Sequence, residues 1–413
     1  MDHFAYRDGV LHAEDVPLTR IAAEVGTPVY VYSAATLVRH YQVFKAAFAP
    51  EDVLVAFAVK GNIAVLATLA KAGAGADTVS AGEITRALTA GIPPERIIFS
   101  GVGKTSEELA FALQANILQI NIESPAELRA LAVLAQRLGK LPNVVIRVNP
   151  GIGAGGNDKI TTGHGEAKFG VSPDQALALY AEARRHTALT PVGLAVHIGS
   201  QIHDLAPLRT AFITLRRMVE ALRAEGHAVT VLDLGGGLGV PYFDAPPPPS
   251  PADYAAMVRE VMAGLDVKLA FEPGRLIAGN AGVLLTQVVR IQDRPDRPIL
   301  VLDAARNDLL RPAMYEAHHA LVPVHAPAAA APLHPVDLVG PVCETGDTFA
   351  RNRPMPPLGA GDLCAFLTAG AYGAVMASTY NARPLVPEVL VAGDRFHLVR
   401  ERFDIAAQLK LEH

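Results

Sequence analysis

A lysine ends one of the apolar stretches of the chain, VLVAFAVKGN at residues 53–62. An ammonium group is costly to remove from water, so a lysine at the end of a buried strand either extends into solvent or has a chemical partner. A partly desolvated amine can form a Schiff base with an aldehyde, because burial lowers its pKa. Lys60 is therefore a candidate for covalent catalysis, and simple extension into water is the alternative.

Further apolar segments along the chain also end on polar residues or glycines. The C-terminal ends of parallel strands in a barrel meet at one rim, where barrel enzymes place their reactive groups. A set of such residues that comes from six predicted strands indicates one shared active site. The set consists of Lys60, Asp77, Ser80, Arg147, Asn149, His197, Ser200, Gly235, Gly236, Gly237, Glu272 and Arg275.

A glycine run, GGGLG at residues 235–239, follows the apolar segment VLDL. Consecutive glycines expose backbone N–H groups that can bind a phosphate, and barrels often bind phosphate after their seventh and eighth strands. The alternative is that these glycines only permit a tight turn. The run is not a dinucleotide fingerprint, which belongs at the first strand of its fold, and no Walker lysine accompanies it.

A lysine, a phosphate site, an acid and a histidine on one rim match the needs of pyridoxal 5'-phosphate (PLP). The acid would keep the ring nitrogen protonated, so that the ring can accept electrons. Glu272 in FEPGR is the candidate for this acid, and His197 could stack on the ring. His318 and His319 are adjacent, but no cluster at ligand spacing accompanies them, so we expect no metal.

These residues require elements that bring them to one rim. Segments with helical spacing separate the strands, and in one of them Ser124 and Glu127 match a capping box. Strands that alternate with helices predict a parallel sheet, and eight such units favour a closed (β/α)8 TIM barrel of the α/β class. The predicted strands span residues 54–60, 75–80, 96–101, 118–124, 143–150, 191–199, 230–237 and 268–274.

After about residue 280 the segments become β-rich, without regular helices between them. We expect a separate C-terminal β domain of barrel-like or sandwich-like form, joined by an N-terminal strand around PVYVYS at residues 28–33. The predicted division assigns residues 31–280 to a PLP-binding barrel. Residues 1–30 and 281–413 then form the β domain.

The composition narrows the functional class. The chain has 413 residues, of which 50% are hydrophobic and 19% charged, with a net charge of -5 and no Lys/Arg block. These values argue against nucleic-acid binding and indicate a globular enzyme. Two cysteines indicate a reducing compartment rather than a disulfide framework. No apolar stretch reaches the length of about 20 residues that a membrane span needs, and the N-terminal segment is mixed and charged, so we expect a cytoplasmic protein.

A family resemblance covers nearly the whole chain, from about residue 4 to residue 390. The sequence resembles the diaminopimelate decarboxylases, a branch of the PLP-dependent decarboxylases that pair an alanine-racemase-like barrel with a β domain. This resemblance implies a carboxy-lyase that removes CO2 from the D centre of meso-2,6-diaminopimelate to give L-lysine, the last step of lysine biosynthesis. The motifs are AFAVKGN, DTVSAGE, TTGHGEAKFG, HIGSQI, LDLGGGLG, FEPGR, NDLLRPAMY, PVCETGD and GAYG.

The resemblance also implies a role for individual residues and a homodimer with shared active sites. Lys60 would form the Schiff base, His197 would stack on the ring and Glu272 would hold the ring nitrogen. Cys343 would donate a proton and Glu344 would recognise the distal amino group, both in the partner's site. The phosphate would be held by Ser200, Gly235, Gly236, Gly237, Gly274 and Arg275 with Tyr372 nearby, and the distal carboxylate by Arg275, Arg311 and Tyr315. Asp77, Ser80 and Arg147 complete the predicted cofactor site, and Tyr372 also counts among the substrate-binding residues.

Several alternatives stay open. Cys343 could be a small buried apolar residue, and Arg311 could cap a helix or pair with Glu316. A related PLP decarboxylase could act on D-ornithine, D-lysine or carboxynorspermidine, and a PLP-binding regulatory homologue would not catalyse at all. The chain departs from the usual motifs at a few positions, and none of these removes a functional side chain. They are Gly61, Ala81, Thr345 and the segment DAARNDL at residues 303–309, where DAGMNDL is more frequent.

Overall fold

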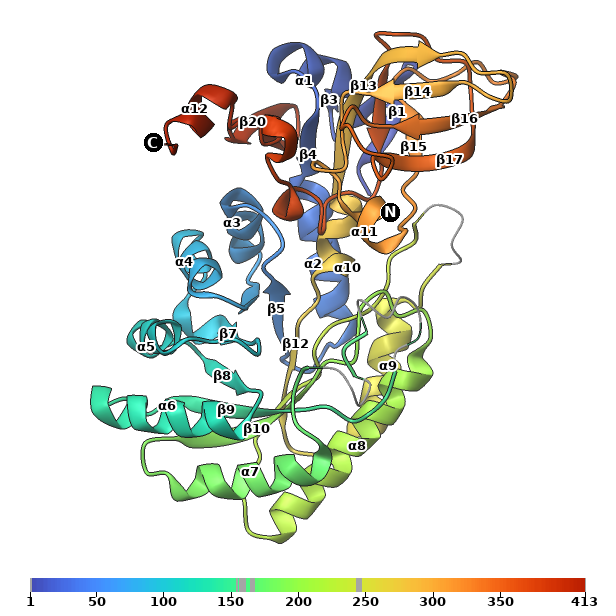
Figure 1. Ribbon diagram of the computed structural model, residues 1–413. Coiled ribbons are helices and arrows are strands. Elements are labelled where there is room, and N and C mark those ends of the chain that lie inside the picture. The colour runs from blue at the N-terminus through green and yellow to red at the C-terminus, as the bar shows by residue number, and fades with distance from the viewer. Residues whose placement is uncertain (1, 154, 156–160, 164–167, 243–246, 413) are drawn as a thin grey trace.

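The structure is a computed structural model that describes residues 2–153, 155, 161–163, 168–242 and 247–412. A barrel forms the lower part of the molecule and a β-rich part lies above it (Figure 1). Residues 164–167 of the TTGHGEAKFG motif lie outside the described residues. Within the described part of the chain, no helix has the length and apolar character to cross a membrane.

Parallel strands close into a barrel in the order β10-β11-β12-β5-β6-β7-β8-β9. The predicted closed barrel is therefore confirmed. Asp77 and Arg147 lie near the C-terminal ends of strands β6 and β9, and the other predicted rim residues lie beyond the ends of their strands. The strands are β5 (Leu54–Ala58), β6 (Gly75–Thr78), β7 (Ile97–Phe99), β8 (Gln119–Ile122), β9 (Asn143–Val148), β10 (Thr190–Val196), β11 (Val231–Asp233) and β12 (Lys268–Phe271).

Helices surround the barrel, and side-chain caps fix where several of them begin. Ser124 caps α6, but Glu127 does not complete the predicted capping box: its carboxylate accepts from Glu123 N at 2.8 Å and from Lys104 Nζ at 2.6 Å. Glu127 thus bonds to Lys104 and to Glu123 N instead of to the backbone N–H of Ser124, which a capping box requires. The helices are α2 (Ala34–Ala47), α3 (Ile63–Lys71), α4 (Ala81–Thr89), α5 (Ser106–Ala115), α6 (Pro125–Leu138), α7 (Pro173–Arg185), α8 (Leu205–Ala224), α9 (Pro251–Met262) and α10 (Arg275–Ala278).

The second part is a nine-stranded sheet with the order β17-β16-β14-β13-β4-β19-β20, to which β18 and β15 attach beside β13. The N-terminal strand β4 (Val29–Ser33) lies between β13 and β19, as predicted for the PVYVYS segment. The other strands are β13 (Gly282–Gln292), β14 (Ile299–Leu302), β15 (Leu321–Pro323), β16 (His334–Val339), β17 (Thr348–Met355), β18 (Leu363–Phe366), β19 (Glu388–Ala392) and β20 (Arg395–Arg400). The predicted boundary at residue 31 falls inside β4, which belongs to the sheet of the β-rich part. The division of the chain at residues 31 and 280 stays a proposal.

Some elements were not expected. The N-terminus forms a small sheet of β1 (Phe4–Arg7), β2 (Val10–Ala13) and β3 (Val16–Pro17), followed by α1 (Leu18–Val25). Two short helices interrupt the β-rich part, where none was predicted: α11 (Arg311–Tyr315) and α12 (Ile405–Leu409). Short 3-10 helices lie at Pro94–Arg96, Gly279–Ala281, Ala374–Met376 and Tyr380–Ala382.

A buried charge connects the two parts next to the loop that carries Lys60. Glu388 on β19 is 1% exposed. It pairs with Arg400 at 2.9 Å and accepts from Asn62 Nδ2 at 3.0 Å. Asn62 also caps α3 by accepting from Val65 N at 3.0 Å. The loop between β5 and α3 is thereby held by the sheet as well as by its own helix.

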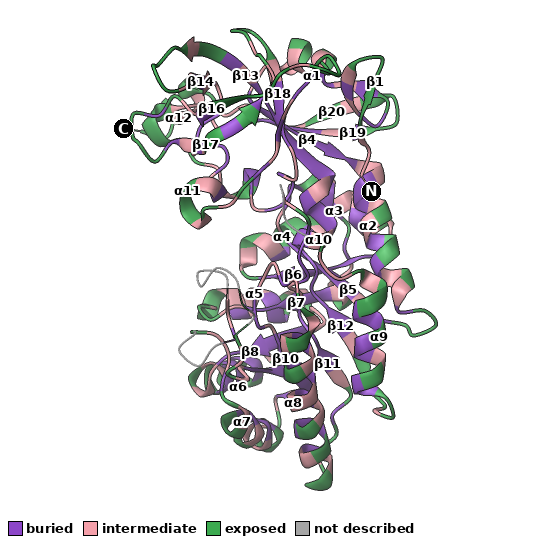
Figure 2. Cartoon of the chain, turned by 90° about the vertical axis from the view of Figure 1, so that its right-hand side faces the viewer, coloured by how far each residue is buried: buried purple, intermediate pink, exposed green. Residues whose placement is uncertain are grey.

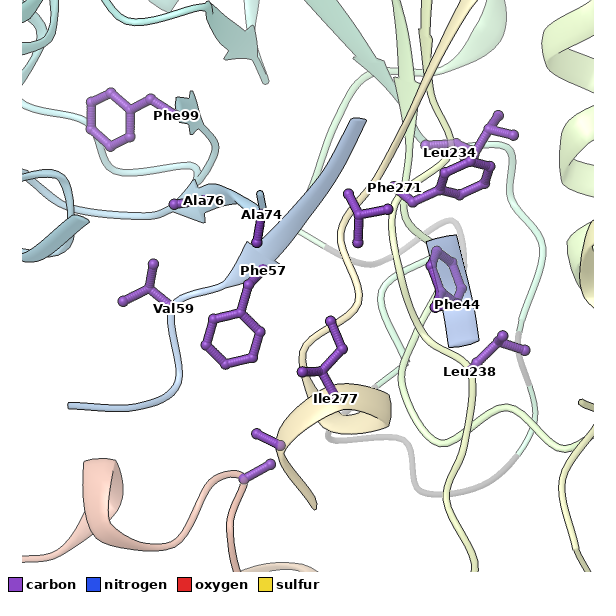
Figure 3. Packing of buried hydrophobic residues seen from close by; sticks show 14 of the residues in the cluster. Phe44, Phe57, Val59, Ala74, Ala76, Phe99, Leu234, Leu238, Phe271 and Ile277 are labelled. Atoms are coloured by element: carbon purple, nitrogen blue, oxygen red, sulfur yellow. The ribbon is translucent and has the colours of Figure 1, made fainter. Parts of the chain in front are cut away.

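Buried residues lie along the barrel strands and on parts of the surrounding helices (Figure 2). Apolar side chains of one large cluster pack together there (Figure 3). Phe48 contacts Phe271 with ring centroids 4.3 Å apart, and Phe44 meets the same ring edge-on at 5.6 Å. Both contacts lie beside β12, so this packing supports the strand from which Glu272 follows.

Phe48→Ala should lower the free energy of unfolding by about 3–5 kcal/mol, because it removes a ring that is 1% exposed and leaves a cavity against Phe271. Denaturant titration followed by circular dichroism measures this change. Val133→Ala is the control, since Val133 on α6 is 69% exposed and its loss should cost less than about 0.5 kcal/mol. Equal effects of the two substitutions would contradict the packing described here.

Candidate active site

A cavity of about 270 Å³ opens at the C-terminal ends of the barrel strands. It gathers residues from β5, β6, β9, β10, β11 and β12 and one tyrosine from the β-rich part. Most of the predicted site residues line it: Lys60, Asp77, Arg147, His197, Ser200, Gly235, Gly236, Gly237, Glu272, Gly274, Arg275 and Tyr372. Within the described residues, no group of three or more His, Cys, Asp or Glu side chains has the arrangement of a metal site.

Lys60 lies in this cavity with its side chain 20% exposed. Its Nζ is 3.4 Å from Oε1 of Glu83. Burial lowers the pKa of Lys60, but the negative charges of Glu83, Tyr372 and Asp77 outweigh burial and raise its pKa overall. The expected fall of the lysine pKa is therefore wrong for the protein alone, because acidic groups surround the amine. Extension into water does not describe this lysine.

His197 follows β10 and faces the cavity. Burial lowers its pKa to about 3, and the positive charge of Arg147 acts in the same direction. Its Nδ1 lies 3.1 Å from Gly236 N, which donates a hydrogen bond to it. The imidazole is therefore neutral with its proton on Nε2, and a neutral ring can stack on an aromatic ligand without an uncompensated charge.

Three acids lie together in the barrel interior. Burial raises the pKa of Glu272 well above its usual value, and the charges of Asp233 and Asp77 raise it further. Ser100 Oγ is 3.5 Å from Glu272 Oε1, and Asn121 Nδ2 donates to both Ser100 Oγ and Asp233 Oδ2 at 3.1 Å. Burial and the neighbouring acids therefore favour the protonated form of Glu272, and Ser100 Oγ lies beside its carboxyl group.

Asp77 offers a test of whether the residues fit a polar ligand. Burial raises its pKa to about 7, with Lys60 lowering it and Asp233 raising it. Its Oδ1 is buried and has no hydrogen-bond partner among the described residues. A buried polar atom without a partner is costly, so a ligand group in the cavity would relieve this cost. The residues present thus fit a cofactor with polar substituents.

The glycine run forms a cradle at the same cavity. Gly235 and Gly237 have φ of 65° and 111°, which disfavour other residues. A Cβ atom at Gly236 would overlap the carbonyl oxygen of Glu272. Arg275 Nη2 donates to Ser200 Oγ at 3.2 Å on the other side of the cradle. This combination of close backbone and a guanidinium group suits a phosphate.

Two arginines meet around Tyr242, which the sequence did not single out. Arg275 Nη1 donates to Tyr242 Oη at 2.7 Å, and the Arg311 guanidinium lies 4.4 Å from the centre of the Tyr242 ring. Burial lowers the pKa of Arg311 and the nearby Arg275 lowers it further. Arg311 Nη1 is 2.8 Å from His319 Nε2. Two buried cations around one ring favour an anionic ligand, which explains the pair better than a helix cap.

Other predicted residues lie outside this cavity. Ser80 caps α4 by accepting from Glu83 N at 3.2 Å. Arg311 and Tyr315 belong to α11 in the β-rich part. Cys343 is exposed, on the turn between β16 and β17, so it is not a buried apolar residue. Glu344 on the same turn pairs with Arg306. These residues do not line the cavity of their own chain.

The sequence also did not single out Asp233, Ser100 and Asn121. Each is buried on or beside a barrel strand, at 0%, 5% and 2% exposure. The signal for Asp233 was present, since an aspartate inside the apolar segment VLDL needs a partner. Its partners come from other strands, and only the closed barrel brings them together.

Known proteins resemble this chain over its length. Residues 34–279 match the family model described as pyridoxal-dependent decarboxylase, pyridoxal binding domain. The diaminopimelate decarboxylase of Zymomonas mobilis is 49% identical, over 97% of this chain and 96% of that protein. The enzyme of the same name from Pseudomonas aeruginosa is 46% identical, with 97% and 96% covered.

Solved structures agree with these sequence matches. The diaminopimelate decarboxylase of Helicobacter pylori complexed with L-lysine has a TM-score of 0.92 at 38% identity, covering 96% of this chain and 99% of that chain. The enzyme from M. jannaschii in co-complex with L-lysine has a TM-score of 0.94 at 33% identity, covering 100% and 98%. Barrel and sheet are thus arranged alike in all three proteins.

Asp77→Asn tests whether burial keeps the Asp77 carboxyl neutral. With a pKa of about 7 in the folded protein and about 4 in the unfolded chain, this group makes stability fall as the pH rises between those values. Asparagine does not ionise and removes this contribution. In urea titrations of the cofactor-free protein, the stability of Asp77→Asn relative to the original protein should increase from about pH 5 to about pH 8.

Asp308→Asn is the matched control, because burial raises the pKa of Asp308 to about 7 as well, in the β-rich part. Both variants should show the same trend with pH, but only Asp77→Asn should change PLP uptake. A stability difference that does not depend on pH would contradict the neutral carboxyl. Equal PLP uptake by the two variants would contradict a place for Asp77 in the cofactor site.

Proposed function

The chain belongs to the diaminopimelate decarboxylase family of PLP-dependent decarboxylases, and from this we propose how its residues carry out that reaction. The reaction removes the carboxylate at the D centre of meso-2,6-diaminopimelate as CO2 and leaves L-lysine. One observation carries the proposal: Lys60, the glycine cradle and the acid Glu272 line a single cavity with an unpartnered buried oxygen on Asp77.

The residues that line the cavity match the aldehyde, the ring and the phosphate of PLP. Lys60 would hold the aldehyde group, His197 would cover one face of the ring, and Glu272 would bind the ring nitrogen. The residues that would hold the phosphate are Gly235, Gly236, Gly237, Ser200, Gly274 and Arg275, with Tyr372 nearby. When bound, PLP supplies a ring that accepts the electron pair left as the bond to the carboxylate breaks.

The acids control protons around the ring. Burial and the acids around Glu272 raise its pKa and so favour its protonated form. With PLP bound, this carboxyl group would be able to supply a proton to the basic ring nitrogen. Asp233 hydrogen-bonds to Glu272 and accepts from Asn121 Nδ2, so both residues help to orient the Glu272 carboxyl group. Glu83 Oε1 lies 3.4 Å from Nζ of Lys60, so its carboxylate offsets the positive charge of the ammonium group.

The far end of the substrate carries an ammonium and a carboxylate group. We assign the carboxylate to Arg275, Arg311, Tyr315 and Tyr372, and the ammonium to Glu344. A site with buried charged partners rejects substrates that lack either group, because the unmatched charge would stay desolvated. Cys343 donates the proton to the carbon that has lost CO2.

Cys343 and Glu344 do not line the cavity of their own chain, so we propose that they complete the cavity of a second copy. The enzyme is then a homodimer with shared active sites, and the exposure of Cys343 in one chain agrees with this arrangement. We also place its action in the cytoplasm, since both cysteines are free thiols.

Lys60→Ala should lose CO2 release from meso-diaminopimelate by orders of magnitude, together with the visible absorbance of bound PLP, because the amine that holds the aldehyde is gone. Lys71→Ala is the control, as Lys71 is exposed on α3 beyond the same loop. A Lys60→Ala enzyme with full turnover would contradict the assignment. Preference for D-ornithine or D-lysine in the same assay would replace the proposed substrate.

Mixing inactive Lys60→Ala and Cys343→Ala proteins tests the shared site. Random exchange of equal amounts makes half of the dimers mixed, and one site of two in each is complete, so about a quarter of the original activity should return. Mass spectrometry of intact dimers verifies the exchange. Proven exchange without any recovery would show that Cys343 acts within its own chain or not at all.

A further inference from the structure

The turn between β16 and β17, residues 340–347, has a defined shape. Gly340 N donates to Asp347 O at 3.0 Å, and Asp347 N donates to Glu344 O at 3.0 Å. The Asp347 side chain is 3% exposed and accepts from Val342 N at 2.7 Å and from Arg306 N at 2.6 Å. A Cβ atom at Gly340 would overlap this carboxylate. The turn is therefore fixed to the backbone at residue 306.

Arg306 also meets the turn through its side chain. Its guanidinium pairs with Oε1 of Glu344 and lies 5.7 Å from the centre of the Tyr380 ring. The two charged side chains are 29% and 35% exposed. An ion pair this exposed contributes little to stability. Both charges remain accessible to a ligand.

A carboxylate beside a guanidinium group treats two kinds of cation differently. A lone ammonium group is attracted by Glu344 but repelled by Arg306. An amino-acid end carries an ammonium and a carboxylate on one carbon. Glu344 can bind the ammonium, while the charge of Arg306 attracts the carboxylate that the arginines and tyrosines of the cavity also contact. The pair is therefore complementary to a zwitterion.

We propose that Arg306 is a specificity-determining residue: the Arg306–Glu344 pair favours substrates whose far end is a zwitterion over those that end in an ammonium group alone. Diaminopimelate is of the first kind, and D-lysine and D-ornithine are of the second. This inference rests on the proposed function, in which Glu344 contacts the far end of the substrate.

Arg306→Met tests the proposal through two constants: KM for meso-diaminopimelate and the inhibition constant of D-lysine against its decarboxylation. Without the guanidinium group, KM should rise and the inhibition constant should fall, so that their ratio shifts by about tenfold in favour of D-lysine. Arg306→Lys keeps the charge and should shift the ratio by less than about threefold.

Arg209→Met is the matched control. Arg209 pairs with Glu260 at 2.6 Å between α8 and α9, with exposures of 39% and 66%, and takes no part in the site. Both constants should stay unchanged in this variant. An unshifted ratio in Arg306→Met, or a rise of both constants together, contradicts the inference alone. Failure of the original protein to release CO2 from meso-diaminopimelate contradicts the proposed function instead.

Discussion

The pairing of β12 with β5 is the constraint on which the site depends. Ala270 lies opposite Leu54 and Phe271 opposite Val55 in a parallel register, and this pairing closes the barrel. The loop after β5 carries Lys60, and the loop after β12 carries Glu272 and Arg275. A Cβ atom at Gly274 would lie 3.1 Å from the Cβ of Ala58, so the loop after β12 touches the end of β5. Closure thus brings Lys60, Glu272 and Arg275 into one cavity from opposite ends of the barrel sequence.

Closure also places charges where water cannot screen them. The acids Asp77, Asp233 and Glu272 share one interior, and burial raises the pKa of each. Arg147, whose guanidinium pairs with Glu123 at 2.9 Å, brings a positive charge to the same space. Buried charged groups of this kind stabilise the fold less than well-packed apolar residues of similar volume would. The cost of burying these acids would be offset if basic groups, a ring nitrogen and an amine, bound next to them.

The sequence predicted the parts of this arrangement that local pattern determines. Eight apolar segments separated by helical spacing predicted the barrel, and the residues after them predicted the rim. A strand around PVYVYS at residues 28–33 was also predicted, and β4 spans Val29–Ser33. Contacts between distant segments were not predictable in this way: Asp233 with Asn121, Tyr242 between two arginines, and Arg306 with Glu344. The raised pKa of Lys60 belongs to the same class, because it depends on acids that approach only in the folded chain.

The central claim is that the amine of Lys60 holds PLP covalently. Borohydride reduction of the PLP-loaded protein, followed by proteolysis and mass spectrometry, tests it most directly. The account predicts one stable pyridoxyl adduct, on the peptide that contains Lys60 and on that residue. An adduct on another lysine, or none despite bound PLP, would contradict the account.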